Sequence, residues 1–174
     1  MHDESKGLIF DIKRDCSEDG PGIRTTVFFK GCPLACVWCH NPEGISPGPT
    51  TSFSSERCNP DACGGYACRD VCPQAAPGID AENEIIRFDF DSCNRCDACF
   101  DVCTPRALEP VGRWWTVQAL MDKILIDQNF FNSTGGGVTL SGGEPTLQMD
   151  FLHRFLVALK NENIHTGLET CGLF

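Results

Sequence analysis

The sequence predicts an α/β fold with a parallel sheet, interrupted by a cysteine-rich insert. Strand-like and helix-like segments alternate in the first and last parts of the chain, which favours parallel strands with crossover helices. Eleven of the 13 cysteines fall in three groups between residues 32 and 103. The composition is globular, with 41% hydrophobic and 22% charged residues. We therefore expect segments 1–50, 51–110 and 111–174, in which the first and last form one domain.

The elements outside the insert follow from local patterns. Residues 25–29 (TTVFF) are β-branched or aromatic and predict a strand. Residues 116–130 carry the apolar stripe of an amphipathic helix, with Thr116 as its N-cap. Strands are expected at 138–140 and 166–170, on either side of a helix over about 146–160. No helix follows the last strand, although parallel strands are usually covered on both faces, so the sequence is expected to stop within its domain.

Charge and cysteine usage exclude several classes of protein. The chain has 14 Lys and Arg against 24 Asp and Glu, and this acidic balance argues against a nucleic-acid-binding surface. No apolar run suits a membrane span, and the polar start of the chain does not resemble a secretory signal. The odd number of cysteines argues against a disulfide scaffold. We therefore expect a cytoplasmic protein whose thiolates bind metal.

The first cysteine group follows the predicted strand 25–29. Cys32, Cys36 and Cys39 have the spacing C-x3-C-x2-C. Three thiolates could hold three irons of a [4Fe–4S] cluster and leave the fourth iron open to a substrate, whereas electron-transfer clusters use four cysteines. A zinc site with His40 as fourth ligand and a set of ordinary buried cysteines are the alternatives.

At this point the chain resembles the radical S-adenosylmethionine (SAM) enzymes. Within them it is most similar to the activating enzymes of glycyl radical enzymes, of which the pyruvate formate-lyase activating enzyme is one. The segments that carry the resemblance are residues 19–24 (DGPGIR), 28–32 (FFKGC), 36–44 (CVWCHNPEG) and 141–145 (SGGEP). The resemblance implies the first part of a partial (β/α) radical SAM barrel. It also implies that the chain is truncated, because the members of this family continue well beyond this point.

The resemblance also implies roles for individual residues. Cys32, Cys36 and Cys39 would ligate the SAM cluster, whose open iron binds the amino and carboxylate groups of SAM. Trp38 stands at the position near the adenine. The remaining SAM-binding positions are Gly142, Gly143 and Glu144 for the amino group, and Glu169 and Thr170 for the carboxylate region. Without the resemblance, residues 142–144 would be interpreted as a plain strand-to-helix turn. Glu169 would be interpreted as a solvated carboxylate at a strand end. No catalytic side chain is expected beyond the cluster.

Two further cysteine runs lie in the predicted insert. The second run, C-x2-C-x2-C-x3-C, matches the bacterial ferredoxin pattern, and the first is a widened version of it. In that pattern the fourth cysteine of each run ligates the other cluster. The expected ligand sets are Cys58, Cys63, Cys68 and Cys103 for one auxiliary cluster, and Cys93, Cys96, Cys99 and Cys72 for the other. A pair of zinc ribbons is the alternative. We thus expect a small α+β ferredoxin-like domain, as many activases of this family contain.

The resemblance implies reductive cleavage of SAM to a 5′-deoxyadenosyl radical, which takes hydrogen from a glycine of a partner enzyme. The expected cofactors are three [4Fe–4S] clusters and SAM. The expected partners are a glycyl radical enzyme and a flavodoxin or ferredoxin reductant, without nucleic acid or membrane. Two other functions stay open: a ferredoxin-type electron carrier, and a radical SAM enzyme acting on a small molecule. The truncated chain is expected to be poorly stable and inactive alone.

Overall fold

The computed structural model describes residues 5–80 and 85–173, and of residue 85 it describes the backbone alone. The chain divides into two compact units. Unit 1 consists of Met1–Gly48 and Gly112–Phe174, and unit 2 is the continuous segment Pro49–Val111. Each unit is described by itself below.

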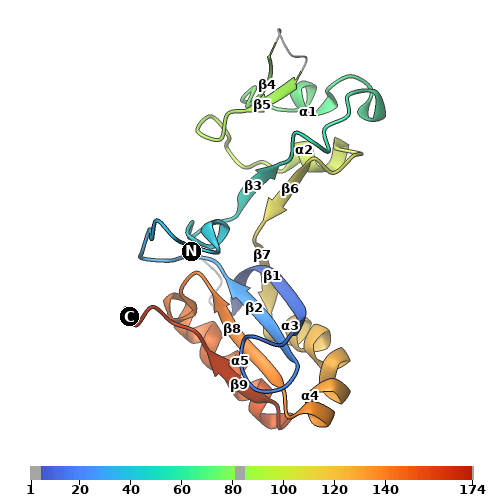
Figure 1. Ribbon diagram of the computed structural model, residues 1–174. Helices are drawn as coiled ribbons and strands as arrows, with labels where there is room; N and C mark the ends of the chain where they lie inside the picture. Colours follow the sequence, from blue (N-terminus) through green and yellow to red (C-terminus); the bar gives the residue numbers. More distant parts are fainter. Residues whose placement is uncertain (1–4, 81–84, 174) are drawn as a thin grey trace. The chain divides into compact units, whose positions relative to one another are not determined.

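Unit 1 contains a five-stranded mixed sheet in the order β7-β1-β2-β8-β9 (Figure 1). The strands are β1 (Lys6–Cys16), β2 (Arg24–Phe29), β7 (Arg113–Thr116), β8 (Gly137–Gly142) and β9 (His165–Leu168). Strands β2, β8 and β9 run parallel to one another, while β1 pairs antiparallel with both β2 and β7. The three parallel strands lie at the predicted places. The antiparallel pair of β1 and β7 was not predicted.

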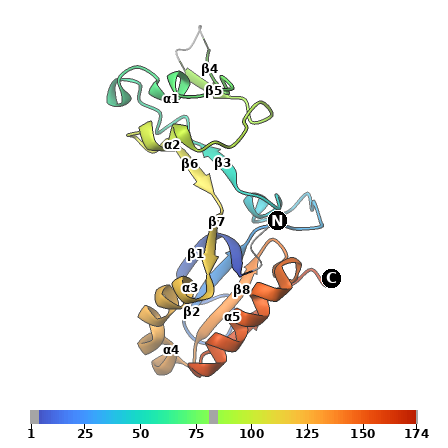
Figure 2. The same cartoon turned by 180° about the vertical axis from the view of Figure 1, so that it is seen from behind.

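The helices of unit 1 pack on one face of this sheet (Figure 2). They are α3 (Val117–Ile124), α4 (Gln128–Thr134) and α5 (Met149–Asn161), joined by the 3₁₀ turns η3 (Leu125–Asp127) and η4 (Pro145–Gln148). The Thr116 hydroxyl caps α3 by accepting a hydrogen bond from the Ala119 N–H at 3.2 Å, as predicted. The single helix expected over 116–130 is wrong, because η3 interrupts it. At that turn the Asp127 carboxylate accepts a hydrogen bond from Thr25 of β2 at 2.8 Å.

The core of unit 1 lies between the helices and the sheet. Its buried residues are Ile9, Val27, Phe29, Leu120, Met121, Ile124, Phe131, Val138, Leu140, Phe151, Leu152, Phe155, Leu159 and Ile164. The opposite face of the parallel strands carries the buried polar residues Arg24, Thr26, Thr139 and Ser141. In the described part of the chain, no helix is long and apolar enough to cross a membrane.

Unit 2 is built from two short antiparallel strand pairs and two short helices. Its elements are β3 (Thr50–Phe53) with β6 (Leu108–Val111), β4 (Pro77–Asp80) with β5 (Ile85–Phe88), η2 (Asp61–Cys63), α1 (Ala67–Asp70) and α2 (Ala98–Val102). A small core around Cys68, Ile86, Cys99 and Leu108 holds them together. The strand predicted near residues 84–88 is β5, apart from residue 84, which lies outside the described residues. Part of the predicted linker between residues 44 and 53 is strand β3.

Candidate functional site

The first three cysteines occupy the loop that follows β2. Cys32, Cys36 and Cys39 are each half-buried, and the Cys39 N–H donates to the Cys36 carbonyl at 3.1 Å. The loop then returns through the 3₁₀ turn η1 (Pro42–Gly44). Three thiols are thus held on one short loop at the carboxyl end of a parallel strand, which is where α/β folds bind their ligands.

Three consecutive hydrogen bonds close the base of this cysteine loop. The Lys30 ammonium donates to the Glu43 carbonyl at 2.7 Å. The next two residues do the same through their main chain: Gly31 N–H donates to Gly44 O at 2.7 Å, and Cys32 N–H donates to Ile45 O at 3.1 Å. Residues 30–32 are therefore fixed against residues 43–45, and the loop between them has a defined start and end.

The turn after β8 packs directly on the loop base. The Gly143 N–H donates to Phe29 O at 2.8 Å, and the Glu144 N–H donates to Gly31 O at 2.6 Å. A Cβ atom at Gly143 would lie 2.3 Å from Gly31 O and 2.7 Å from Gly44 O, so this close approach requires glycine. The cysteine loop and the predicted SAM-binding turn, about a hundred residues apart in sequence, are joined through their backbones.

The Glu144 carboxylate is fully buried and bonded to its own chain. It accepts hydrogen bonds from the Thr146 N–H at 3.0 Å and hydroxyl at 2.7 Å. It also accepts from the Thr170 hydroxyl at 2.9 Å and the Cys171 N–H at 2.6 Å. Burial alone would raise the pKa of Glu144, but the hydrogen bonds from Cys171 and Thr146 outweigh it and lower this pKa to about 2. The side chain thus ties the turn after β8 to the segment after β9.

The predicted residues after β9 reach the same region. Glu169 is exposed, and its carboxylate accepts a hydrogen bond from the Ser141 hydroxyl at the end of β8. The hydroxyl of the next residue, Thr170, donates its hydrogen bond to the Glu144 carboxylate. The exposed Cys171 thiol also contacts Glu144, which raises the pKa of this thiol, and the nearby Cys32 raises it further. No sequence pattern predicted that Cys171 lies near Cys32 of the cysteine loop.

Trp38 and its neighbour Val37 project from the tip of the cysteine loop. Trp38 is 76% exposed and Val37 is 95% exposed. The structure therefore places an aromatic ring next to Cys39 without packing it on the rest of unit 1.

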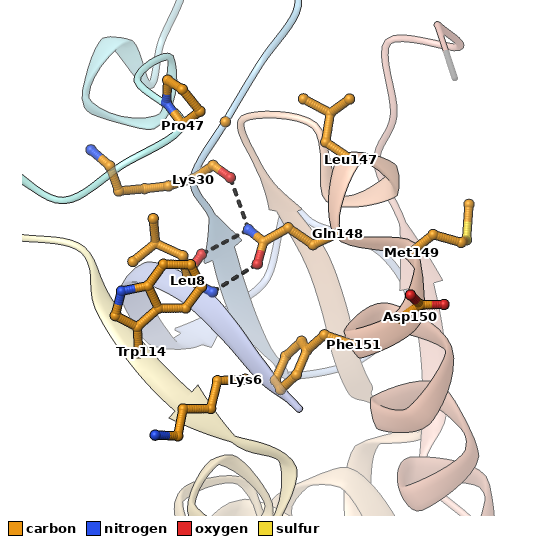
Figure 3. A pocket seen from close by; sticks show the side chains of 11 residues that line it. Lys6, Leu8, Lys30, Pro47, Trp114, Leu147, Gln148, Met149, Asp150 and Phe151 are labelled. Carbon is orange, nitrogen blue, oxygen red and sulfur yellow. Dashed lines mark hydrogen bonds between the residues drawn. The ribbon is translucent and has the colours of Figure 1, made fainter. Parts of the chain in front are cut away.

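A pocket of about 340 Å³ lies beside the loop base, and Figure 3 shows its lining. Gln148 forms its floor: the side-chain amide donates to Leu8 O at 3.0 Å and Lys30 O at 2.8 Å, while its oxygen accepts from the Leu8 N–H at 2.7 Å. These bonds hold β1 and the end of β2 at the point where the two strands separate. Lys30 was noted only as part of the segment 28–32 and Gln148 not at all, because their hydrogen-bond partners lie more than ten residues away.

The DGPGIR segment (residues 19–24) lies at the amino ends of the parallel strands, opposite the cysteine loop. Arg24, at the start of β2, is fully buried, and its guanidinium donates to Thr139 Oγ1 at 2.6 Å and to Val138 O at 2.7 Å. It also contacts Pro21 O and His165 Nδ1, each at 3.2 Å. This arginine joins the amino ends of β2, β8 and β9, and lies away from the cysteine loop.

Unit 2 gathers most of its thiols around its small core. Cys58, Cys63, Cys68 and Cys103 line one small cavity together with apolar side chains from β3, β5 and β6. Backbone N–H groups point at several sulfurs: Leu108 N–H donates to Cys103 Sγ at 3.3 Å, Ala76 N–H to Cys72 Sγ at 3.4 Å, and Arg95 N–H to Cys93 Sγ at 3.4 Å. Such contacts are known to tune iron–sulfur clusters.

The pKa shifts in unit 2 show which thiols lie close together. Burial raises the pKa of Cys68 to about 11, helped by Cys103, Cys63 and Cys58. Burial likewise raises the pKa of Cys99 to about 11, helped by Cys93, with smaller effects from Cys68 and Cys72. Cys96 is exposed. Cys103 thus lies near Cys58 and Cys68 of the other run, and Cys72 lies near Cys99.

Soft thiolates are the ligands that iron–sulfur clusters use, so the donor sets in both units are chemically suited to such clusters. Within residues 5–80 and 85–173, no three His, Cys, Asp or Glu side chains converge closely enough to hold a single metal ion. The ligand sets therefore remain predictions.

Comparison with known proteins shows which proteins the chain is similar to. Residues 18–62 match the model of a 4Fe-4S single cluster domain. The chain is 40% identical over 167 residues to the 4-hydroxyphenylacetate decarboxylase activating enzyme of Clostridioides difficile, covering 95% of this chain and 52% of that protein. It is 43% identical over 166 residues to the trans-4-hydroxy-L-proline dehydratase activating enzyme of the same species, covering 95% of this chain and 53% of that one.

A third relative is the (2S)-3-sulfopropanediol dehydratase activating enzyme of Klebsiella oxytoca, with 36% identity over 171 residues, 98% of this chain and 53% of the relative. The chain is thus a homologue of glycyl-radical-enzyme activating enzymes, as its motifs predicted. It spans about half the length of the curated relatives it matches.

Proposed function

We propose that this chain is part of a glycyl-radical-enzyme activating enzyme that cleaves SAM reductively. The observation that carries the proposal is the backbone contact between the cysteine loop and the turn after β8. In a three-cysteine site the cluster and the SAM amino group must be held at a fixed separation. The hydrogen bonds from Gly143 and Glu144 to residues 29 and 31 supply such a fixed link.

In this proposal each group of residues has one task. Cys32, Cys36 and Cys39 hold a [4Fe–4S] cluster with one open iron, and that cluster supplies the electron that cleaves SAM. The Gly142–Gly143–Glu144 backbone faces the SAM amino group. The N–H groups of residues 143 and 144 already donate to carbonyls of this chain. They are not needed to bind the SAM amino group, because an ammonium requires hydrogen-bond acceptors rather than donors. Trp38 packs on the adenine, which would cover its exposed ring. Glu169 and Thr170 border the carboxylate region.

We further propose that unit 2 is a ferredoxin-like domain with two [4Fe–4S] clusters, inserted into a partial (β/α) radical SAM barrel formed by unit 1. The shared cavity of Cys58, Cys63, Cys68 and Cys103 supports the first ligand set. The effects of Cys93 and Cys72 on the pKa of Cys99 support the second. A flavodoxin or ferredoxin in the cytoplasm would be the reductant, and a glycyl radical enzyme the protein substrate.

The test is anaerobic reconstitution with iron and sulfide, followed by iron counting, EPR with and without SAM, and detection of 5′-deoxyadenosine. Three clusters require about twelve irons per chain, and the Cys36→Ala variant should lose about four of them together with the effect of SAM on the EPR signal. The matched control is Cys16→Ala, because Cys16 pairs with Arg24 at the start of β2, the end opposite the cysteine loop, and this variant should keep both. About eight irons without any effect of SAM would favour an electron carrier instead.

A further inference from the structure

The two ligand sets proposed for unit 2 differ in how deeply their thiols are buried. In the first ligand set, Cys68 belongs to the small core of this unit, and Cys58 and Cys103 pack against that core. One small cavity is lined by all four thiols of this set, Cys58, Cys63, Cys68 and Cys103. Apolar side chains supply much of the remaining wall, among them Phe53, Ile86, Val102 and Leu108. The first ligand set is therefore enclosed by the interior of unit 2.

The second ligand set lies closer to the surface. Cys93 and Cys96 belong to the segment 89–97, in which every residue other than the half-buried Cys93 is exposed. In the same set Cys99 is buried and Cys72 is half-buried. Even Phe90, whose ring packs on that of Phe88, is 54% exposed. A cluster held by this set would thus be bound, at Cys96, by a ligand on the surface of unit 2.

Burial has a direct consequence for a cluster that accepts an electron. Reduction adds one negative charge, and a charge costs more free energy in an apolar interior than where water solvates it. Solvent exposure is accordingly one of the factors that set the potential of iron–sulfur clusters. Hydrogen bonds to sulfur are another factor, but both sets receive them: Leu108 N–H donates to Cys103 at 3.3 Å, and Ala76 N–H donates to Cys72 at 3.4 Å.

The charged side chains next to the two sets act in the opposite direction, but weakly. Arg57 precedes Cys58 in the first set, and Asp97 follows Cys96 in the second. Arg57 is exposed and its charge is paired with Glu109 at 3.0 Å. Asp97 is exposed as well, so water and salt screen both charges. The difference in burial therefore decides which set favours the reduced cluster.

We propose that, of the two auxiliary clusters, the one held by the second ligand set has the higher reduction potential and is reduced first. This inference rests on the proposed function, which places two clusters in unit 2. One electron passes from the external reductant to this cluster, and no bond is made or broken. The enclosed cluster of the first ligand set is reduced only at a more negative potential. The exposed Cys96 marks the place where the reductant can approach most closely.

The test is an anaerobic redox titration of the reconstituted full chain, followed by EPR in the absence of SAM. Cys63→Ser and Cys96→Ser replace the second cysteine of each run, so each should change the signal of one auxiliary cluster and thereby assign it. The component changed by Cys96→Ser should have the more positive midpoint. A water-soluble lanthanide chelate should also enhance the spin relaxation of this component more than that of the component changed by Cys63→Ser.

Val102→Thr tests the same idea with all ligands in place. It adds a hydroxyl to the cavity wall of the first ligand set at nearly constant shape. It should raise the midpoint of the component changed by Cys63→Ser and leave the other midpoint where it is. The inference is overturned if the Cys63→Ser component has an equal or more positive midpoint, or if Val102→Thr does not raise that midpoint.

Iron counting on the Cys36→Ala variant separates this inference from the proposed function. Two auxiliary clusters require about eight irons in that variant. Fewer irons would overturn the assignment of two clusters to unit 2, and this inference with it. A full complement of irons with the opposite order of midpoints would overturn this inference alone.

Discussion

At the scale of single residues, Glu144 shows how a motif and a structure can assign different tasks to one side chain. The sequence places it in a turn expected to bind SAM. The structure engages its carboxylate with Thr146, Thr170 and Cys171, which lie 2 to 27 positions away. Sequence pattern could identify the turn, because Gly142, Gly143 and Pro145 mark it locally. It could not identify the contacts to Thr170 and Cys171, since these depend on how β8 and β9 pair.

Replacing Glu144 should weaken the fold in a pH-dependent way. The folded-state pKa of about 2 lies below the ordinary value of 4.5, so the carboxylate stabilises the fold above about pH 4.5, and this contribution is lost as the pH falls towards 2. Glu144→Gln should therefore lower the free energy of unfolding at pH 7 by about 1–3 kcal/mol. The deficit should shrink between pH 4.5 and pH 2.

Urea unfolding at a series of pH values measures this difference. The control is Glu162→Gln, at the exposed end of α5, which should change the free energy of unfolding little. If Glu144→Gln and Glu162→Gln behaved alike at pH 7, the buried carboxylate would not be the link between the two segments.

At the scale of elements, the three parallel strands were predictable, whereas the antiparallel strands β1 and β7 were not. The strand β2 and the helix α5 follow from several consecutive apolar or β-branched positions. The strand β7 has four residues and the pattern RWWT, which contains no turn signal or alternation to define it. The break of the expected helix at η3 depends on Asp127 reaching Thr25 and Arg14 of neighbouring strands. Such tertiary contacts override local periodicity.

The contact between the turn after β8 and the loop base should not tolerate a side chain at Gly143. In Gly143→Ala the new Cβ would meet Gly31 O at 2.3 Å, so the backbones must separate. We expect a loss of about 1–3 kcal/mol in the free energy of unfolding, as for overpacked sites. We also expect the effect of SAM on the EPR signal to disappear.

Gly172→Ala provides the comparison for backbone strain without crowding: nothing lies within 4 Å of a Cβ atom there, but its φ of +74° is unfavourable for alanine, whereas Gly143 has no such positive φ. A response to SAM that survives in Gly143→Ala but not in Gly172→Ala would show that the segment after β9, rather than the turn after β8, controls the SAM site.

At the scale of the whole molecule, unit 2 is a continuous segment inserted into a discontinuous unit 1. Its first and last strands, β3 and β6, pair so that Thr50 lies opposite Val111. Partners in an antiparallel pair have Cα atoms about 5 Å apart. The cysteine spacing made an insert predictable, and the boundaries at 49 and 111 come from this strand pair, whose four-residue strands are too short to define from sequence.

Unit 1 should therefore fold without unit 2. Joining Gly48 to Gly112 through a short Gly-Ser linker spans the small gap between the paired strand ends. The shortened chain should keep a cooperative urea transition, and after reconstitution it should hold about eight fewer irons than the full chain. Circular dichroism and iron counting provide the measurements. A shortened chain without a cooperative transition would show that unit 1 depends on the insert.

The arrangement of the sheet also has a consequence for synthesis on the ribosome. Unit 2 is complete once residue 111 has been made, and its paired strands are close in sequence or lie at its two ends. The apolar face of β2 must wait for β8, more than a hundred residues later. The cysteine-rich unit can thus fold first and bring the two separated parts of unit 1 together, as domains generally fold in units during synthesis. An insert of this kind shortens the effective loop that β2 and β8 must close.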